Sequence, residues 1–400
     1  MDFSMLYIPK EELYCLAVLV ILAVIQIAVA LKKKYSVKKL QVDSFQDIDA
    51  NAKPSLSVIV YADKEIGAFL NQSIPAIFNQ NYNDYEVIIV NADSSETVDD
   101  MITILTAQYP KLKSTFIPDS ICNVSIRKLA TMLGVKAAAN DVVIFTDANC
   151  IPLTDNWLAS MARKFSDETG VVIGYASVDV SSDASFGHRY RIFDKVEDSV
   201  EYLLAASSNH AFRGDRMNIA YRKELFFDNK GFSRTMNMKY GDDDIFIREL
   251  SELAKIKPEL SEDSFVKEMP VDYASSFVVN KLHRAFTMSK INPGFKKISW
   301  VIANLRVIYL ILTAVAIALS VVSIIKDPAI ALHSIIFGGV AIVLFITDLL
   351  VYLFSVRKVM DVLKMPKLLF TIPLFREIRP FVNLYYKMHS SKIDNYTWER

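Results

Sequence analysis

The sequence predicts an α/β protein with one mostly parallel sheet and three membrane-spanning helices. Short apolar runs rich in β-branched residues alternate with segments of helical periodicity between residues 54 and 145. Three long apolar runs lie toward the two ends of the chain and raise the hydrophobic content to 52%. The 400 residues are therefore expected to form one large α/β domain and a membrane part.

The first apolar run, Leu13–Leu31, has about the length that spans a bilayer once. Lys32, Lys33 and Lys34 follow it directly. A cleavable signal peptide has its positive charges before the apolar run, so this order predicts a retained anchor. Because positive charges stay on the cytoplasmic side, the N-terminus is expected outside.

Two later runs, at about Ile308–Ile325 and Ala329–Val356, are separated by Lys326-Asp327-Pro328. The proline favours two antiparallel helices over one long helix. Basic residues flank the pair on both sides and predict that it begins and ends in the cytoplasm. Asp348, inside the second run, is either a functional intramembrane charge or an aspartate that faces a neighbouring helix.

These spans predict a multi-pass protein of the inner (cytoplasmic) membrane whose main domain is cytoplasmic. The tail segment Met365–Pro380 mixes apolar and basic residues and could lie along the cytoplasmic leaflet. The predicted parts are an anchor (1–34), a juxtamembrane linker (35–53), an α/β domain (54–299), a transmembrane helix pair (300–358) and a cytoplasmic or interfacial tail (359–400).

Within the α/β domain, apolar runs predict three strands and helical spacing predicts three helices. The strands are expected at Leu56–Tyr61, Tyr85–Val90 and Val142–Phe145, and the helices at Ile66–Asn79, Asp99–Tyr109 and Val124–Ala139. This β-α-β-α-α-β order implies a parallel, doubly wound sheet with right-handed crossovers. Periodicity is uninformative over Ser181–Ser208, which is expected to contain loops.

Carboxylates follow all three predicted strands: Asp63 and Glu65 the first, Asp93 the second and Asp147 the third. Open α/β sheets bind ligands at this edge. The glycine-rich motifs of dinucleotide-binding proteins and P-loop NTPases are absent. Carboxylates suit Mg²⁺ or Mn²⁺ bridging a diphosphate. The structural alternative is that Asp147 caps the next turn.

Other functions are disfavoured by composition. The three cysteines have no metal-ligand spacing and suit a reducing compartment. The formal net charge is zero, and aromatic residues do not interleave with basic ones. A nucleic-acid partner is therefore not expected.

Six segments, in this order and spacing, resemble family 2 glycosyltransferases of the GT-A type over roughly residues 54–290. They are PSLSVIVYADKE, YEVIIVNADSSET, VVIFTDANCIP, GDRMNIAYRKELFFDNKGF, KYGDDDIFIR and KLHR. The fourth and fifth blocks most resemble membrane-attached members from bacteria of the Bacteroidetes type. The resemblance implies a GT-A fold, a nucleotide-sugar donor that is first expected to be UDP-linked, and a divalent metal.

The resemblance also implies roles for individual residues. Asp147 and Asn149 match the DxD motif and would contact the metal, and Asp242 matches the catalytic base. The residues that would bind the nucleotide sugar are Tyr61, Asp63, Glu65, Asp93, Asp147 and Arg284. Those expected on the acceptor side are Arg216, Asn218, Asp243 and Asp244.

The chemistry of glycosyl transfer agrees with these roles. A carboxylate must take the proton of the attacking hydroxyl, and positive charge must stabilise the departing diphosphate. The adjacent carboxylates Asp242–Asp244 would repel one another and raise the pKa of one of them toward neutrality. Alternatively, they form a solvated helix N-terminus favoured by the helix dipole. Arg284 is either a diphosphate ligand or an ordinary surface arginine.

Several positions depart from the family pattern. Asn149 replaces a carboxylate of the DxD motif, Gly241 stands where the family has Glu, and Asn91-Ala92 replace two aspartates. Lys281 and Ala285 replace the Gln and the aromatic residue of the QxxRW motif, which argues against a long-chain polymerase.

Three functions are compatible with this sequence. The first is an inverting transferase that acts on a membrane-associated, lipid-linked or glycan acceptor in the synthesis of bacterial envelope polysaccharide or glycoconjugate. The second is a catalytically degenerate subunit that binds a partner transferase. The third is a processive synthase of a short polysaccharide.

Overall fold

The computed structural model describes residues 10–46, 54–93, 95–178, 185–269, 273–291, 293–326, 331–365, 368, 370–392 and 396–397. Contacts divide the chain into two compact units. The helical unit comprises Met1–Ser36, Asn292–Val362 and Lys367–Pro380. The sheet unit comprises Val37–Ile291, Leu363–Pro366 and Phe381–Arg400.

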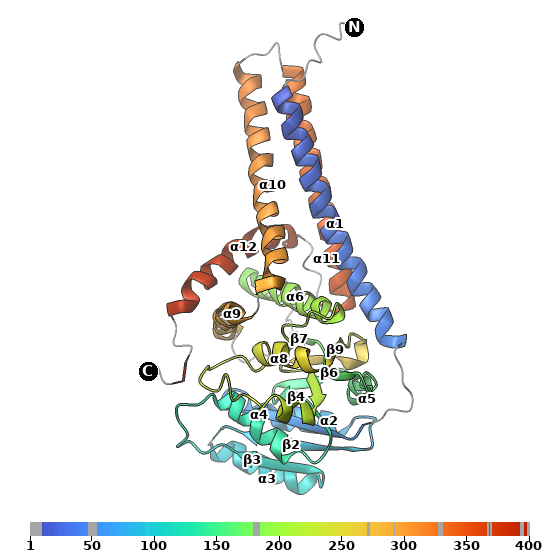
Figure 1. Cartoon of the computed structure of the whole chain (residues 1–400), viewed down its shortest axis with the longest axis vertical. Helices are drawn as coiled ribbons and strands as arrows, with labels where there is room; N and C mark the ends of the chain where they lie inside the picture. The colour runs from blue at the N-terminus through green and yellow to red at the C-terminus, as the bar shows by residue number, and fades with distance from the viewer. Residues whose placement is uncertain are drawn as a thin grey trace. The chain divides into compact units, whose positions relative to one another are not determined.

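Within these described ranges, three helices are long and apolar enough to cross a membrane: α1 (Lys10–Gln46), α10 (Pro293–Lys326) and α11 (Ala331–Val362) (Figure 1). They contain the first two apolar runs identified in the sequence and residues 331–356 of the third. Helix α1 continues to Gln46, so the first part of the expected linker is helical. Residues 47–53 of that linker and 327–330 of the expected turn lie outside the described residues.

The helical unit contains a cluster of buried charged groups. Asp348 of α11 is completely buried and accepts hydrogen bonds from Arg306 Nη1 of α10 at 2.5 Å and from Arg376 Nη1 at 2.9 Å. Arg376 belongs to α12 (Ile372–His389), and its neighbour Glu377 pairs with Arg306. Asp348 thus faces guanidinium groups of two neighbouring helices, as the structural interpretation of this residue requires.

The sheet unit is built on a mixed seven-stranded sheet in the order β3-β2-β1-β4-β8-β6-β9. Strands β1 to β4 are parallel to one another, whereas β8 is antiparallel to both of its neighbours. The α/β fold class with a mostly parallel sheet is therefore confirmed. The strands are β1 (Leu56–Ala62), β2 (Tyr85–Asn91), β3 (Leu112–Phe116), β4 (Val142–Asp147), β6 (Thr169–Ile173), β8 (Ile219–Arg222) and β9 (Lys255–Pro258).

A second, three-stranded sheet lies in the order β5-β10-β7. Its strands are β5 (Cys150–Pro152), β7 (Ala176–Val178) and β10 (Val266–Glu268). Strand β4 ends at Asp147, and after two intervening residues the chain enters β5 at Cys150. Pro152 therefore ends a second short strand in another sheet.

The three strands predicted from the sequence are confirmed, but the predicted element order was incomplete. Strand β3 lies at the sheet edge between α3 (Glu96–Gln108) and α4 (Ile126–Ala137). Only Leu112 of β3 is buried, so the segment lacks the apolar run by which a strand is recognised. The order up to β4 is therefore β-α-β-α-β-α-β.

Helices cover both faces of the parallel part of the sheet. Val58 and Val60 of β1 pack in one core with Leu70 of α2 (Leu70–Phe78) and Ile102 of α3. Side chains alternate along a strand, so Ile59 points to the opposite face. There it meets α4, where a Cβ added to Gly134 would lie 2.5 Å from Ile59 Cγ2.

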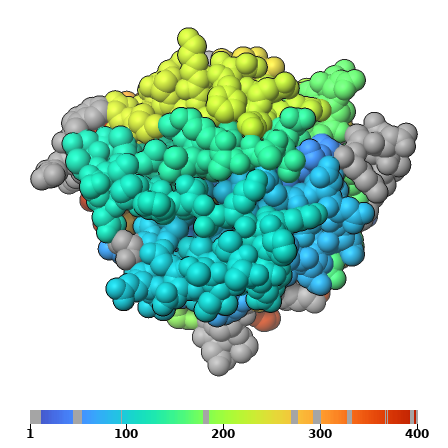
Figure 2. All heavy atoms as spheres, turned by 90° about the horizontal axis from the view of Figure 1, so that it is seen from below, coloured from blue at the N-terminus to red at the C-terminus, as the bar shows by residue number. Residues whose placement is uncertain are grey.

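The remaining described helices of the sheet unit include α6, which corrects an expectation. Residues 186–207 were expected to contain loops, but they form the 22-residue helix α6 (Phe186–Ser207). The others are α5 (Trp157–Ala162), α7 (Lys223–Asp228), α8 (Ile245–Leu253) and α9 (Tyr273–Lys290). Figure 2 shows the yellow segment around α7 and α8 lying directly beside the teal segment around α4.

Candidate active site

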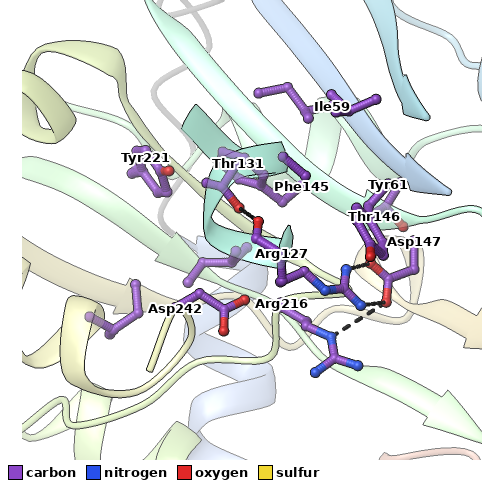
Figure 3. Close-up of a pocket in the computed structure, with 14 residues that line it drawn as sticks. Ile59, Tyr61, Arg127, Thr131, Phe145, Thr146, Asp147, Arg216, Tyr221 and Asp242 are labelled. Carbon is purple, nitrogen blue, oxygen red and sulfur yellow. Dashed lines mark hydrogen bonds and ion pairs between the residues drawn. The ribbon is translucent and has the colours of Figure 1, made fainter. Parts of the chain in front are cut away.

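A pocket opens where β1 and β4 end. Tyr61 and Asp147 are partners in the parallel register of these two strands, so their side chains share one face of the sheet. That face is the one covered by α4. The pocket, here called the strand-end pocket, is lined by these two residues and by Arg127, Arg216 and Asp242 (Figure 3).

Asp147 is held by two arginines. Its carboxylate is 2% exposed and accepts from Arg127 Nη1 at 2.5 Å, from Arg127 Nη2 at 2.9 Å and from Arg216 Nε at 3.4 Å. The Arg127 guanidinium also lies 3.8 Å from the centre of the Tyr61 ring. Burial raises the pKa of Asp147, but the two guanidinium groups outweigh it and hold the pKa below its ordinary value.

The topology explains why these two arginines meet Asp147. Arg127 is in the first turn of α4, on the face of the sheet to which Tyr61 and Asp147 point. Arg216 precedes β8, which runs antiparallel to β4 with Ile219 opposite Phe145. The residues just before β8 therefore pass the end of β4.

A second pocket lies between the segment that carries Arg216, just before β8, and the helices α6 and α9. This α6–α9 pocket shares Arg216 and Asp242 with the strand-end pocket. Its other charged or titratable lining residues are His188, Arg191, Asp194, Lys195, Asp215, Tyr240, Asp243, Asp244, Glu268, His283 and Arg284. Asp242 and Arg216 therefore lie at the boundary between the two pockets and line both of them.

The backbone before Asp242 requires a glycine. Gly241 has a φ of +114°, a conformation that L-residues with side chains rarely adopt. A Cβ at this position would also lie 3.1 Å from Ile245 Cδ1. Gly241 stands where the family has Glu, and a Glu would be strained in the backbone conformation found here.

The three carboxylates after Gly241 have different environments. Burial, followed by the charges of Asp242 and Asp244, raises the pKa of Asp243 to about 7. Asp244 is the N-cap of α8 and accepts from Ile245 N at 2.6 Å, while burial raises its pKa. Asp244 thus caps a helix, but it is 3% exposed and therefore not the solvated N-terminus of the alternative interpretation. Asp242 lines both pockets, and its role as the base stays a prediction.

Ion pairs fix the charged groups around the α6–α9 pocket. Lys195 Nζ lies 3.0 Å from Asp215, Lys281 Nζ lies 2.6 Å from Asp194, and Arg284 pairs with Asp198. Burial raises the pKa of Asp215, but Lys195 outweighs it, so the pKa lies below its ordinary value.

His283 is neutral in this environment. Burial, and then the positive charges of Arg216 and Lys239, lower its pKa to about 3. Burial and the charge of Arg191 also lower the pKa of His188, the second histidine of this pocket. The pocket is lined by more carboxylates than Lys and Arg side chains.

The carboxylates after β1 and β2 make local turns and line neither pocket. Asp63 Oδ1 accepts from Glu65 N at 3.0 Å, and Glu65 itself is exposed. Asp93 Oδ1 accepts from Ser95 N at 2.9 Å. The structure therefore does not bring Asp63, Glu65 or Asp93 into contact with Asp147.

Two predicted amide ligands are engaged elsewhere. Asn218 is buried, accepts from Trp157 Nε1 at 3.0 Å, and donates to Tyr175 O and Ser264 O. Asn149 is also buried and donates to Met269 O at 2.7 Å. Neither amide lines the two pockets, so both residues join segments of the fold in this structure.

Arg284 lies in the α6–α9 pocket and not beside Asp147. The arginine that contacts Asp147 at the shortest distance, Arg127, was missed by sequence reasoning. No motif surrounds it, and the available signal was a basic residue at the start of a helix on the ligand-binding side of the sheet.

The donor atoms allow a test of whether a divalent metal fits. Among the residues described by the structure, no group of three or more His, Cys, Asp or Glu could hold a metal ion. Metals that bridge a diphosphate, however, use one or two carboxylates and take other ligands from phosphate and water. Asp147 fits that requirement if its carboxylate gives up hydrogen bonds to Arg127 and Arg216 when it binds the metal.

Comparison with known proteins adds the class of activity. The family model described as "Glycosyl transferase family 21" matches residues 15–186, which include Asp147. The chain is a glycosyltransferase. The match supports the glycosyltransferase resemblance, whereas the family 2 assignment and the Bacteroidetes-type origin stay predictions.

Solved structures support the fold. The chain is 14% identical to the mannosyltransferase PcManGT from Pyrobaculum calidifontis in complex with GDP-Man and Mn²⁺, with a TM-score of 0.50. That match covers 84% of this chain and 99% of the other. This chain therefore has a GT-A-like fold.

A second solved structure, GalNAc-T7 with UDP, GalNAc and Mn²⁺, is also 14% identical and has a TM-score of 0.41. It covers 56% of this chain and 44% of that one, and this likeness is too low to support an argument. A comparison with curated proteins found no match.

Proposed function

We propose that this glycosyltransferase moves a sugar, with inversion, from a nucleotide-sugar donor to a hydroxyl group of a membrane-associated acceptor. The observation that carries the proposal is that Asp242 and Arg216 line both pockets, whereas Asp147 lines the strand-end pocket alone. In the proposal the donor occupies the strand-end pocket and the acceptor occupies the α6–α9 pocket. Asp242 then lies between the two substrates.

The charges in the strand-end pocket suit a diphosphate. Arg127 and Arg216 present guanidinium groups at the end of β4, and guanidinium binds phosphate oxygens well. Asp147 is the residue that would hold a divalent metal, Mg²⁺ or Mn²⁺. When bound, such a metal supplies positive charge to the departing diphosphate.

The proposed reaction is a single displacement. The acceptor oxygen attacks the anomeric carbon from the face opposite the diphosphate, and Asp242 takes the hydroxyl proton. The bond from the anomeric carbon to the diphosphate oxygen breaks, and its electron pair leaves with the nucleoside diphosphate. Arg127 and Arg216 offset the negative charge that develops there.

Three helices that could cross a membrane support an acceptor held at a membrane. In the proposal these helices anchor the protein in the bacterial inner membrane, with the sheet unit in the cytoplasm and the N-terminus outside. A lipid-linked or glycan acceptor for envelope polysaccharide or glycoconjugate synthesis fits this location. Labelling a cysteine introduced into the Lys32–Lys34 segment with a membrane-impermeant reagent tests the orientation, because a cytoplasmic site reacts only after the membrane is opened.

The test of the activity is release of nucleoside diphosphate by the full chain in lipid nanodiscs. A panel of UDP- and GDP-sugars is assayed with Mg²⁺, with Mn²⁺ and with a chelator. GDP-sugars belong in the panel because PcManGT binds GDP-Man. Metal-dependent release from one donor is expected, and its loss in an Asp147→Ala variant is expected as well. Release that is unaffected by Asp147→Ala would contradict the proposed donor site.

The alternative of a degenerate, non-catalytic subunit is motivated by Asn149 and Gly241, which replace two acidic residues of the family pattern. Calorimetry distinguishes it. A non-catalytic subunit would bind none of the UDP- or GDP-sugars with metal present and would instead co-purify with a partner transferase. A processive synthase of a short polysaccharide would yield products of several sizes on a sizing gel.

A further inference from the structure

The segment Thr235–Lys239 leads directly to Gly241 and Asp242, and it has little regular structure of its own. Its backbone carbonyl groups are instead bound by two other parts of the sheet unit. One part is the first turn of α4, and the other is the short described piece of the C-terminal tail, Tyr396–Thr397. The position of Asp242 therefore depends on contacts that come from distant parts of the chain.

On the α4 side, the contacts come from Lys128 and Ser125. Lys128 is completely buried, and its Nζ donates to Thr235 O at 2.5 Å and to Met238 O at 3.2 Å. Ser125 Oγ donates to Lys239 O at 2.6 Å. A buried ammonium group is costly unless it is well paired, so the Lys128 side chain holds its two carbonyl partners firmly. With the contact from Ser125, three carbonyl groups of this segment are bound from one end of α4.

On the tail side, the contacts are made by backbone and hydroxyl groups. Tyr396 forms an antiparallel bridge with Met238, and Thr397 N donates to Asn237 O at 2.9 Å. Thr397 Oγ1 donates to Asn123 O at 2.9 Å, just before α4. The tail thus joins the same segment to the chain that enters α4.

The neighbouring residue on α4, Arg127, holds Asp147 through a bidentate ion pair. Consecutive residues of one helical turn therefore contact the donor-side carboxylate and the segment that carries the proposed base. Because a helix turn is rigid, it fixes the separation of the two.

We propose that Lys128 is a positioning residue for glycosyl transfer, which sets Asp242 relative to Asp147 by binding the carbonyl groups of Thr235 and Met238. This inference rests on the proposed function of Asp242. A merely structural lysine would affect the amount of folded protein and not the rate per folded molecule. A positioning lysine affects the rate of the chemical step and leaves donor binding intact.

The charge of Lys128 gives the proposal a second signature. Burial lowers the pKa of Lys128 to about 8, although the carboxylates of Asp242, Asp244 and Glu249 face it and oppose the shift. Phe232 lies against it with its ring centre 5.8 Å from Nζ. Above this pKa the lysine keeps two of its three N–H donors but loses the charge that strengthens its hydrogen bonds. The rate is therefore expected to fall at alkaline pH.

The experiment compares Lys128→Met and Lys128→Arg with Lys136→Met, an exposed lysine in the last turn of the same helix. We expect Lys128→Met to lower kcat by about 10- to 100-fold with a donor KM within about threefold of wild type. Lys128→Arg keeps a permanent charge, so it should retain most of kcat and lose the alkaline fall near pH 8. A kcat for Lys128→Met equal to that of Lys136→Met, or an unchanged alkaline limb in Lys128→Arg, would overturn the proposal.

Two further measurements guard against a folding defect and against failure of the proposed function. Thr397→Val removes a tail contact without emptying a buried charge site, and it should lower kcat several-fold at an unchanged melting temperature. Hydrogen exchange of residues 235–244 requires no substrate, and it should rise at least tenfold in Lys128→Met. If the wild-type protein consumes no nucleotide sugar, the proposed function is wrong. If hydrogen exchange of residues 235–244 is unchanged in Lys128→Met, the proposed role of Lys128 is wrong.

Discussion

The helical unit and the sheet unit each bury carboxylates among arginines, but they balance them differently. In the helical unit Asp348 receives hydrogen bonds from both Arg306 and Arg376, and Glu377 pairs with Arg306 as well. In the sheet unit Asp147 is paired in the same way, whereas Asp242 and Asp243 line pockets beside it. One cluster is closed, and the other adjoins space that a ligand can fill.

The pKa of Asp243 shows what this difference means energetically. Burial and two adjacent carboxylates raise it to about 7, which indicates that its charge is not compensated by the neighbouring arginines. Unbalanced buried charge is costly for folding and typical of functional sites. Neutralising a charge should therefore damage stability in the helical unit and activity in the sheet unit.

The largest effect is expected from Asp242→Asn. If Asp242 is the base, its loss should lower kcat by about 10² to 10⁴-fold, the usual contribution of a general base, with little change in donor binding. Nucleoside diphosphate release and calorimetry measure the two quantities. Asp100→Asn, on the exposed side of α3, is the matched control and should behave as wild type. A kcat within a factor of about three of wild type would exclude Asp242 as the base.

The sequence predicted the parts of this comparison that depend on local pattern. Strands β1, β2 and β4 are buried over nearly their whole length, so their apolar runs were recognisable. Helix α6 was missed because its buried face includes Asp194 and Asp198, whose partners Lys281 and Arg284 lie on α9. Buried charged residues whose partners lie far away in the sequence interrupt the apolar periodicity by which a helix is recognised.

The same reason limited prediction of the site. Strand order placed Asp147 at a ligand-binding edge, and the structure puts it in one pocket with Asp242. Arg127 and Lys128 carry no motif, and their contacts, Asp147 and the segment Thr235–Lys239, come from other parts of the chain. Tertiary contacts of this kind are visible only in the fold.

The next largest effect concerns the helical unit. Asp348→Ala should lower the free energy of unfolding by about 3 to 5 kcal/mol, because the buried Arg306 and Arg376 would lose the carboxylate that they share and Arg306 would keep only Glu377. Thermal unfolding in lipid nanodiscs measures the change. Asp361→Asn is the control on the same helix, where an exposed pair with Lys358 at 3.7 Å contributes little. Equal melting temperatures for the two variants would show that the closed cluster is not structural.

A smaller effect is expected when one arginine of the strand-end pocket is removed. Arg127→Gln should weaken binding of the nucleoside diphosphate by about 10- to 100-fold, since a bidentate cation would no longer face the phosphates. The pKa of Asp147 should rise because only Arg216 would then oppose the effect of burial. Arg248→Gln, which loses local contacts with Ser251 and Glu252 and lines neither pocket, serves as the control in calorimetry. Undiminished affinity in Arg127→Gln would separate this arginine from the donor.

The smallest effect is a pH-dependent gain in stability from Asp243→Asn. A carboxyl group whose pKa is raised from 3.8 to about 7 on folding binds its proton more tightly in the folded chain, so stability falls as pH rises between these values. Asparagine cannot ionise and removes that loss. The variant should therefore melt a few degrees above wild type at pH 8 and close to wild type at pH 4.5, where Asp243 is protonated in the folded state. A gain of the same size at both pH values would mean that packing, and not the uncompensated charge, distinguishes this site from the closed cluster of the helical unit.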